Sequence, residues 1–307
     1  MTRRDILQLG SVLAIGSNSA PASASAGALL IGGPIFLKSE DPADLAREHR
    51  RIGYSAAYCP AVKLGDKDRL RAIEAAFAKE KVVIAEVGAW KNLLDPDLAK
   101  RKENFDYVVE RMAIAEEVGA RCCVDIAGSY NAKSWYGPHP KNLTKEGFDA
   151  TVENCRRILD AVKPKRSFFT VEVMGWLHPD SPDGYLRLIK AVDRKAFAVH
   201  LDVCNAVNSP EKFYHSGVMI DEWFRKLGPH IRSCHAKDLE WVVELNLHFL
   251  EVIPGRGEVD YRAYLRGLNG LREAAPLMLE HLKTAEEYKE GFEYIKKIAA
   301  EMKYSLA

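Results

Sequence analysis

Mostly apolar runs of strand length alternate with longer amphipathic stretches along most of the chain. Eight such runs have the apolar, β-branched character of buried strands; they span 28–37, 54–59, 82–87, 121–126, 171–173, 198–205, 231–235 and 277–280. Stretches with helical character separate and follow them, at 44–51, 66–79, 97–118, 144–162, 183–192, 220–227, 261–268 and 285–302. The pattern predicts eight consecutive strand–helix units.

The predicted strands are hydrophobic on both faces, which is typical of parallel strands in a sheet that helices cover. Eight strand–helix units over this length fit a (β/α)8 TIM barrel better than an open sheet. We therefore expect an α/β fold with a single barrel domain over residues 27–307. Neither GxGxxG nor GxxxxGK[ST] follows the first strand, so a dinucleotide-binding or P-loop fold is unsupported.

Four of the predicted strands end in a side chain that can bind a metal. Glu172, Asp202, His235 and Glu280 stand at the ends of the fifth to eighth strands. Because the C-terminal ends of barrel strands meet at one mouth, we expect these four to converge there. A buried, unpaired carboxylate is costly, so a cation is the expected compensation. A single strand-end acid is often a helix N-cap, and only the set of four favours a metal site.

Three carboxylates and one imidazole form a ligand set dominated by oxygen. Such a set suits Mn²⁺, Mg²⁺ or Co²⁺ better than structural zinc, which prefers sulfur and nitrogen. We therefore expect a divalent cation as the cofactor, with Mn²⁺ first and Mg²⁺, Co²⁺ or Zn²⁺ as the alternatives.

The same segments resemble a known family, the xylose isomerase-like TIM barrels, which include sugar isomerases, ketose 3-epimerases, inosose dehydratase and endonuclease IV. The resemblance extends over about 28–304, and it rests on segments 171–174 (VEVM), 200–205 (HLDVCN), 235–238 (HAKD), 254–261 (PGRGEVDY) and 279–281 (LEH). It implies that Glu172, Asp202, His235 and Glu280 are the metal ligands. It also implies that Glu172 and Glu280 form the catalytic acid/base pair.

The activity implied by the resemblance is that of a metal-dependent isomerase or epimerase of a keto-sugar or sugar derivative. Proton abstraction next to a carbonyl would pass through a metal-stabilised enediolate, and the second glutamate would return a proton. Loss of a β-hydroxyl instead gives dehydration, so a lyase of the inosose dehydratase kind is the alternative. A phosphodiesterase of the endonuclease IV type has less support, because the first four strands lack the histidines that it needs.

Residues around the ligand set differ from those of the ketose 3-epimerases. Those enzymes carry a glutamate, a histidine and an arginine where this chain has His178, Asn205 and Trp241. The substrate clamp is therefore expected to differ, with His178 and Asn205 among the residues that bind substrate. Lys237 is a further candidate, which would neutralise an oxyanion or donate to a hydroxyl. The alternative for Lys237 is a rim salt bridge, with Asp238 as its partner.

Other side chains are candidates near the mouth. Glu86 ends the third strand and Trp90 follows it, so both are expected at the substrate; the alternative for Glu86 is a helix cap or rim charge. Arg256 lies between two glycines in a loop that could reach the substrate. His200 shares the inward parity of Asp202 one layer deeper, which favours a hydrogen-bonded or core histidine behind the ligands. A further loop carries the aromatic side chains Trp135, Tyr136 and His139. It either forms a lid over the mouth or packs on the end of the barrel.

The composition limits the kinds of binding partner that we expect. The 307 residues are 47% hydrophobic and carry a formal net charge of +1, which argues against a protein built to bind nucleic acid. No stretch has the ~20 apolar residues that span a bilayer. A small carbohydrate is therefore the expected partner, and a homo-oligomer stays open. Six cysteines without CxxC spacing are expected in the core rather than in disulfides.

The first 26 residues have the order of an export signal. Arg3 and Arg4 precede an apolar stretch, and small residues ending in Ala24-Ser25-Ala26 follow. The arginine pair resembles the twin-arginine type, which serves proteins exported already folded. We expect a periplasmic or otherwise exported protein, with a disordered tail and a cytoplasmic location as the alternative. Export would favour glycosides or oxidised sugars as substrates over sugar phosphates.

Overall fold

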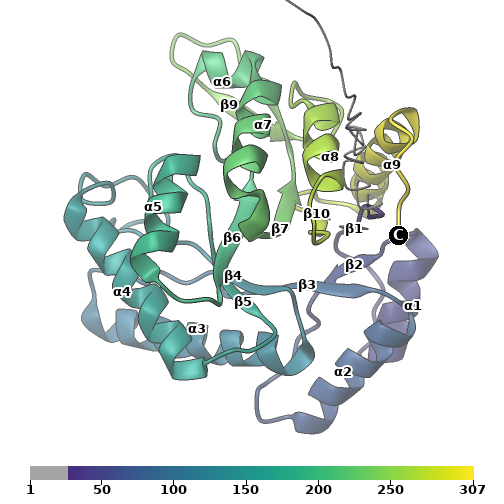
Figure 1. Ribbon diagram of the computed structural model, residues 1–307, viewed down its shortest axis with the longest axis horizontal. Coiled ribbons are helices and arrows are strands. Elements are labelled where there is room, and N and C mark those ends of the chain that lie inside the picture. The colour runs from purple at the N-terminus through teal and green to yellow at the C-terminus, as the bar shows by residue number, and fades with distance from the viewer. Residues whose placement is uncertain (1–26) are drawn as a thin grey trace, which may run out of the picture.

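Residues 27–307 are described by a computed structural model, in which eight parallel strands form a closed barrel (Figure 1). The predicted export signal at 1–26 lies outside the described residues. The strands follow chain order around the barrel, and the last one closes onto the first. The prediction of a single (β/α)8 barrel is confirmed. The bounds of the strands are β1 (Ile31–Gly32), β2 (Ala56–Tyr58), β3 (Val83–Gly88), β4 (Cys122–Asp125), β5 (Phe168–Glu172), β6 (Phe197–Asp202), β7 (Ile231–Ala236) and β10 (Leu277–Leu279).

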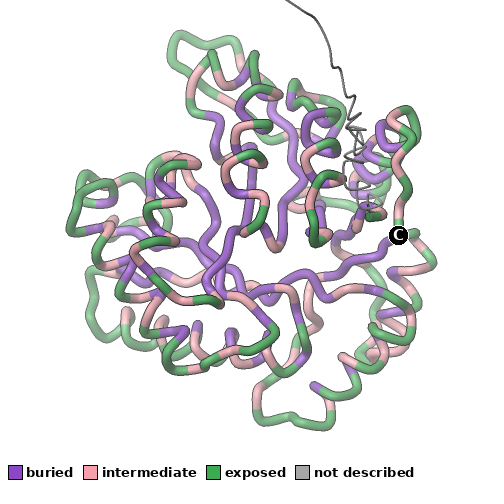
Figure 2. Tube along the Cα trace, in the orientation of Figure 1, coloured by how far each residue is buried: buried purple, intermediate pink, exposed green. Residues whose placement is uncertain are grey.

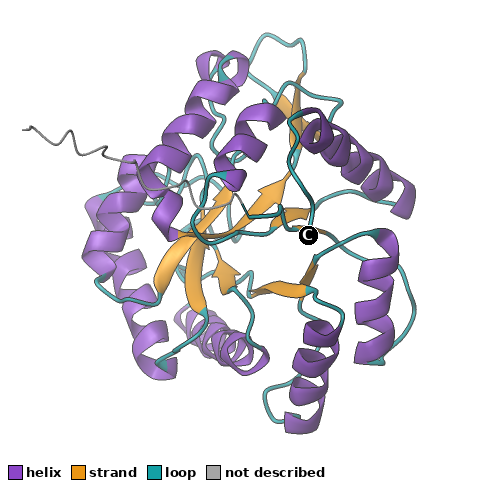
Figure 3. Cartoon of the chain, turned by 45° about the vertical axis from the view of Figure 1, so that its right-hand side comes forward, coloured by secondary structure: helices purple, strands orange, loops and turns teal. Residues whose placement is uncertain are grey.

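Helices cover the outside of the barrel, so the strands are buried while the outer helix faces are exposed (Figures 2 and 3). In α9 the first turn carries a capping box, in which Thr284 and Glu287 exchange hydrogen bonds. Gly119 ends α3 in the left-handed conformation, with φ of 66°, as expected of a C-cap glycine. The bounds are α1 (Pro42–Ile52), α2 (Lys67–Lys79), α3 (Leu98–Val118), α4 (Lys145–Val162), α5 (Pro182–Val192), α6 (Pro210–Tyr214), α7 (Ser216–Leu227), α8 (Tyr261–Asn269) and α9 (Ala285–Glu301), with a 3-10 turn η1 at Gly228–His230.

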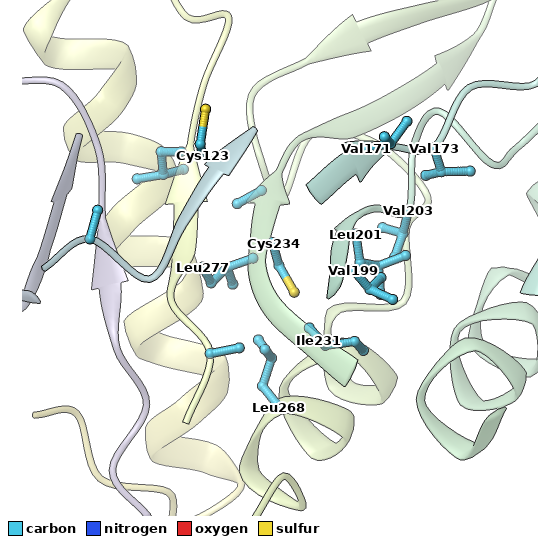
Figure 4. Packing of buried hydrophobic residues seen from close by; sticks show 14 of the residues in the cluster. Cys123, Val171, Val173, Val199, Leu201, Val203, Ile231, Cys234, Leu268 and Leu277 are labelled. Atoms are coloured by element: carbon cyan, nitrogen blue, oxygen red, sulfur yellow. The ribbon is translucent and has the colours of Figure 1, made fainter. Parts of the chain in front are cut away.

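Most buried apolar side chains lie between the barrel and the helices (Figure 4). Along β6 the side chains alternate: Val199 and Leu201 join this core, whereas His200 and Asp202 point into the barrel toward His235. Burial of an aliphatic side chain contributes about 1.5–3 kcal/mol. A shift of one residue would turn the apolar set into the barrel and the polar side chains against the helices. Packing therefore fixes the strand register and with it the polar side chains inside the barrel.

The sequence pattern predicts no strand between 236 and 260, but the structure has two there. β8 (Asp238–Trp241) and β9 (Phe249–Val252) pair antiparallel as a hairpin after β7. Aromatic contacts hold the hairpin to the short helix α6, with the rings of Phe213 and Phe249 stacked at 5.0 Å. These contacts join segments that are distant in sequence, so no local pattern reveals the hairpin.

The cysteines and the helices agree with the expectations from composition. All six cysteines are free, five of them buried and Cys59 partly exposed, so they serve as small core side chains. No helix within residues 27–307 combines the length and the apolar character needed to cross a membrane.

Candidate active site

The four predicted ligand residues converge at the C-terminal mouth of the barrel. They come from β5, β6 and β7 and from the residue after β10, and their ligand atoms all lie within 4.8 Å of one another. His235 turns Nδ1 toward the three carboxylates. That nitrogen lies 3.1 Å from Glu172 Oε1, 2.8 Å from Glu280 Oε1 and 3.7 Å from Asp202 Oδ2. The convergence expected from the strand ends is therefore present.

The donor set fits a divalent cation. Three carboxylates and one imidazole nitrogen are ligands that such cations accept, and Asp202 Oδ2 is buried without a hydrogen-bond donor. Lys237 Nζ forms an ion pair with that oxygen at 2.7 Å, which balances part of the negative charge. Three carboxylates meet at this site, and buried negative charge needs compensation. A cation held by these four residues would add to the positive charge of Lys237.

Lys237 lies inside the site, directly after β7. Its Nζ donates to Glu251 Oε1 at 3.0 Å and to Asn205 Oδ1 at 3.2 Å, and it lies 3.2 Å from Glu280 Oε1. Asn205 Nδ2 donates in turn to Glu172 Oε1 at 3.1 Å. Lys237 and Asn205 therefore tie the carboxylates on opposite sides of the mouth together.

The salt bridge between Lys237 and Asp238, the alternative raised by the sequence, is not formed. The Asp238 carboxylate is buried, and it accepts backbone N–H groups from Leu239, Gly255, Gly257 and Val259. Asp238 thus anchors the loop at 254–261, and the ammonium group of Lys237 faces the mouth instead.

Burial and the attraction between opposite charges set the pKa values of the site. Burial raises the pKa of Glu172 to about 7, against the opposing effect of His235. At Glu280 burial is the largest effect and would raise the pKa, but His235 and Lys237 together outweigh it and lower the pKa to about 2. At Asp202 burial is again the largest effect, and Lys237 and His235 together outweigh it and lower the pKa of that carboxyl. The carboxylates in turn raise the pKa of His235 and Lys237, which burial alone would lower. The site thus concentrates negative charge around two cationic side chains.

Glu86 and His200 lie one layer below the ligands. β3 continues to Gly88, so Glu86 is inside the strand rather than at its end, and it is buried. Glu86 Oε2 lies 3.3 Å from His235 Nε2, and Ser233 Oγ donates to Glu86 Oε1 at 2.6 Å. Contrary to the prediction, Glu86 does not line the mouth. His200 lies behind the ligands, as its parity predicts, with its ring 4.1 Å from that of His235.

A cavity of about 650 Å³ opens at the ligand set; we call it the mouth cavity. Three of the predicted substrate residues, Trp90, Asn205 and Lys237, line it. Aromatic walls with a few convergent polar groups are typical of small-molecule sites, and they suit a ligand that has apolar faces and hydroxyl groups. The aromatic residues of the wall are Tyr58, Trp90, Trp135, Tyr136 and Trp176.

Two predicted substrate residues, His178 and Arg256, lie elsewhere. Arg256 forms a bidentate ion pair with Glu290 at the surface, with N–O distances of 2.6 and 2.8 Å. His178 packs edge-to-face against Phe148 and lines a separate surface cavity beside α4 and α5. Neither residue lines the mouth cavity. Both were predicted from their place in a motif, whereas loop conformation decides where such side chains point.

A carboxylate and an imidazole of the mouth cavity were not identified from the sequence. Glu251 comes from β9, and His281 follows the predicted ligand Glu280; His281 Nδ1 lies 2.7 Å from Glu251 Oε2. Glu251 belongs to the unpredicted hairpin, and no local signal marks it. His281 directly follows a predicted ligand, so its place in the sequence could have identified it as a residue of the site.

A closed barrel with ligand residues at its C-terminal mouth defines the class of protein, a TIM barrel with an enzyme-type site. The chain belongs to the xylose isomerase-like TIM barrel family, whose model matches residues 47–298. No curated protein matches the chain.

Several solved structures share this fold. A D-psicose 3-epimerase from Clostridium cellulolyticum is 13% identical with a TM-score of 0.62, covering 88% of this chain and 99% of that chain. A xylose isomerase-like protein from Mycobacterium smegmatis in complex with magnesium is 17% identical with a TM-score of 0.59, covering 84% and 88%. Endonuclease IV from Thermus thermophilus is 14% identical with a TM-score of 0.65, covering 89% and 99%. At these identities the likeness shows the fold alone.

Proposed function

We propose that this protein is a divalent-metal-dependent isomerase or epimerase that acts on a keto-sugar or a sugar derivative. The observation that carries the proposal is the convergence of Glu172, Asp202, His235 and Glu280 at a cavity with aromatic walls. Membership of the xylose isomerase-like family supports it, as does a fold shared with a D-psicose 3-epimerase.

The two glutamates are the acid/base groups of the proposal. When bound, the cation would polarise a substrate carbonyl and so acidify the neighbouring C–H bond. Glu172 on β5 and Glu280 after β10 stand at the two ends of the ligand set, with β6 and β7 between them. One glutamate can remove a proton from one face of the substrate while the other returns one to the opposite face, which is epimerisation. Return of the proton to the adjacent carbon is isomerisation.

Lys237, Asn205 and Trp90 serve to bind and orient the substrate. The ammonium group of Lys237 stands beside two of the carboxylates, where it can balance negative charge that develops on a substrate oxygen. Asn205 connects Lys237 to Glu172, so the orientation of that glutamate depends on it. Trp90 offers an apolar face for a sugar ring.

Elimination is the second candidate function, and the Glu251–His281 pair favours it. Glu251 orients the His281 imidazole at the cavity, where it can donate to a leaving hydroxyl. With Glu172 or Glu280 as the base, loss of that hydroxyl would make the protein a lyase. An endonuclease has no comparable support, because no histidine from β1 to β4 lines the mouth cavity within the described residues.

Hydrogen exchange with solvent tests the proposal. Protein loaded with Mn²⁺ is incubated in D₂O with a panel of keto-sugars, and NMR follows deuterium at the carbon next to the carbonyl. We expect incorporation by the wild type and a loss of about 100-fold or more in Glu280→Gln, because an acid/base group contributes about 10²–10⁴-fold. Chelation with EDTA should abolish the exchange.

Glu290→Gln is the matched control, since Glu290 is a surface residue paired with Arg256. It should exchange at the wild-type rate. An unsaturated, ultraviolet-absorbing product in place of exchange would favour the lyase. Exchange that persists without any bound cation would contradict the proposal.

A further inference from the structure

A second cavity adjoins the mouth cavity. It has a volume of about 350 Å³ and lies between the segment after β3 and the first turns of α3; we call it the outer cavity. Trp90 and Trp135 line both cavities, so the two spaces lie on either side of this pair of residues. The remaining residues that line the outer cavity are Lys91, Asn92, Asp95, Lys100 and Asn104.

Trp90 is held between the two cavities in an unusual conformation. Its φ is +49°, in the left-handed region that bulky residues rarely adopt. Its indole lies over Gly88, where an added Cβ would come within 2.3 Å of Trp90 Nε1. The indole also stands 6.2 Å from the ring of His235. Strained residues of this kind cluster at ligand sites, because the surrounding structure must maintain them. The fold therefore holds this indole in one position at the border of the two cavities.

The outer cavity is polar, and its side chains have free hydrogen-bonding capacity. Lys100 Nζ makes no ion pair or hydrogen bond within residues 27–307, and Lys91 Nζ lies over the Tyr107 ring, 4.9 Å from its centroid. Asn104 donates through Nδ2 to the Asn92 carbonyl at 2.9 Å, which leaves its side-chain oxygen as an acceptor. Ammonium and amide groups beside indoles suit a hydroxylated ligand, because hydroxyls take the hydrogen bonds while C–H faces lie on the rings.

A single pyranose would leave much of these two neighbouring cavities empty. Pockets of about 300–1,000 Å³ hold ligands of drug size, and the mouth cavity alone is about 650 Å³. We propose that the outer cavity is a second sugar-binding subsite and that the substrate is a glycoside. Its keto-sugar unit lies at the metal ligands, and its next hydroxylated unit lies in the outer cavity. The identity of the first unit rests on the proposed function.

Calorimetric titration of the Mn²⁺-loaded protein tests the subsite. Cellobiose and maltose are each compared with the methyl glucoside of the same anomeric configuration, so that the paired ligands differ by one hydroxylated unit. We expect at least one disaccharide to bind about tenfold or more tightly than its methyl glucoside, because the added unit forms new hydrogen bonds in the outer cavity.

Two variants change the outer cavity without touching the mouth cavity, Lys100→Ala and Asn104→Ala. Each should weaken disaccharide binding by about fivefold or more and leave methyl glucoside affinity unchanged. Lys102→Ala is the matched control, since Lys102 also lies on α3 but pairs with Asp106 outside the cavity. It should change neither affinity.

Equal affinities for each disaccharide and its methyl glucoside would overturn the second subsite, as would the absence of disaccharide binding. A loss of disaccharide affinity in Lys102→Ala equal to that in Lys100→Ala would also overturn the subsite. The deuterium experiment separates this result from the proposed function. Exchange without a disaccharide preference removes the subsite and leaves the sugar chemistry, whereas a preference without exchange supports the subsite and counts against the chemistry.

Discussion

At the scale of the residue, both ring nitrogens of His235 have carboxylate neighbours. Nδ1 faces Glu172, Asp202 and Glu280 at the mouth, whereas Nε2 faces Glu86 one layer below. A ligating histidine whose second nitrogen is held by a carboxylate keeps one tautomer and one ring orientation. We therefore propose that Glu86 positions His235 for metal binding rather than contacting the substrate.

Glu86→Gln should weaken metal binding. The amide keeps the size of the side chain but loses the charge beside His235 Nε2, and loss of such a partner costs about 10–100-fold in metal affinity. Calorimetric titration with Mn²⁺ measures the change, with Glu290→Gln as the surface control. Wild-type affinity in Glu86→Gln would contradict the positioning role.

At the scale of the element, the backbone conformation of the loop between β9 and α8 requires glycine at two positions. The same conformation sets the direction of Arg256. Gly255 has a φ of +96°, and a Cβ on Gly257 would lie 2.3 Å from the Leu239 carbonyl oxygen. The Asp238 carboxylate accepts the backbone N–H groups of both glycines. The loop is thus fixed by its backbone, and Arg256 points away from the mouth toward the surface.

Asp238→Asn should destabilise the protein. The amide has one acceptor oxygen, so its NH₂ group would face backbone donors that the carboxylate now satisfies. A buried unsatisfied donor costs about 1–3 kcal/mol, so we expect the free energy of unfolding to fall by about 2 kcal/mol or more. Urea denaturation measures the loss. Asp106→Asn, at an exposed residue paired with Lys102, is the control, and an equal effect in both variants would refute the anchoring role.

At the scale of the whole molecule, the closed barrel gathers acidic side chains from distant parts of the chain at one rim. Glu172, Asp202 and Glu280 share it with Glu251 from the hairpin, and Lys237, His235 and His281 lie against these carboxylates. A cation that binds the folded state alone therefore stabilises the whole barrel, because none of these groups is assembled in the unfolded chain.

Saturating Mn²⁺ should raise the melting temperature. At a concentration of 100 times Kd, binding adds about 2.7 kcal/mol to the stability, which corresponds to about 5–10 °C for a domain of this size. Calorimetry with and without EDTA measures the shift. Asp202→Asn should lose most of it, whereas Glu290→Gln should keep it; an unchanged shift in Asp202→Asn would argue against the ligand set.

By itself, the sequence determined the barrel and the convergence of four side chains, the proposed metal ligands, at its mouth. Alternation of apolar runs with amphipathic stretches specifies the number and order of the strand–helix units, because each element must bury its apolar face. Parallel strands of a closed barrel end at one rim, so strand-end position alone brings Glu172, Asp202, His235 and Glu280 together. The twin-arginine leader stays a prediction.

Only the tertiary structure decided how deep the neighbouring side chains lie in the barrel and in which direction they point. Strand β3 runs two residues past Glu86 and so places it below the mouth, and the loops turn His178 and Arg256 away from it. The hairpin brings Glu251 to the mouth, and Trp90 and Trp135 form a wall that two cavities share. Loop conformation depends on contacts between segments that are distant in sequence, and no local periodicity records those contacts.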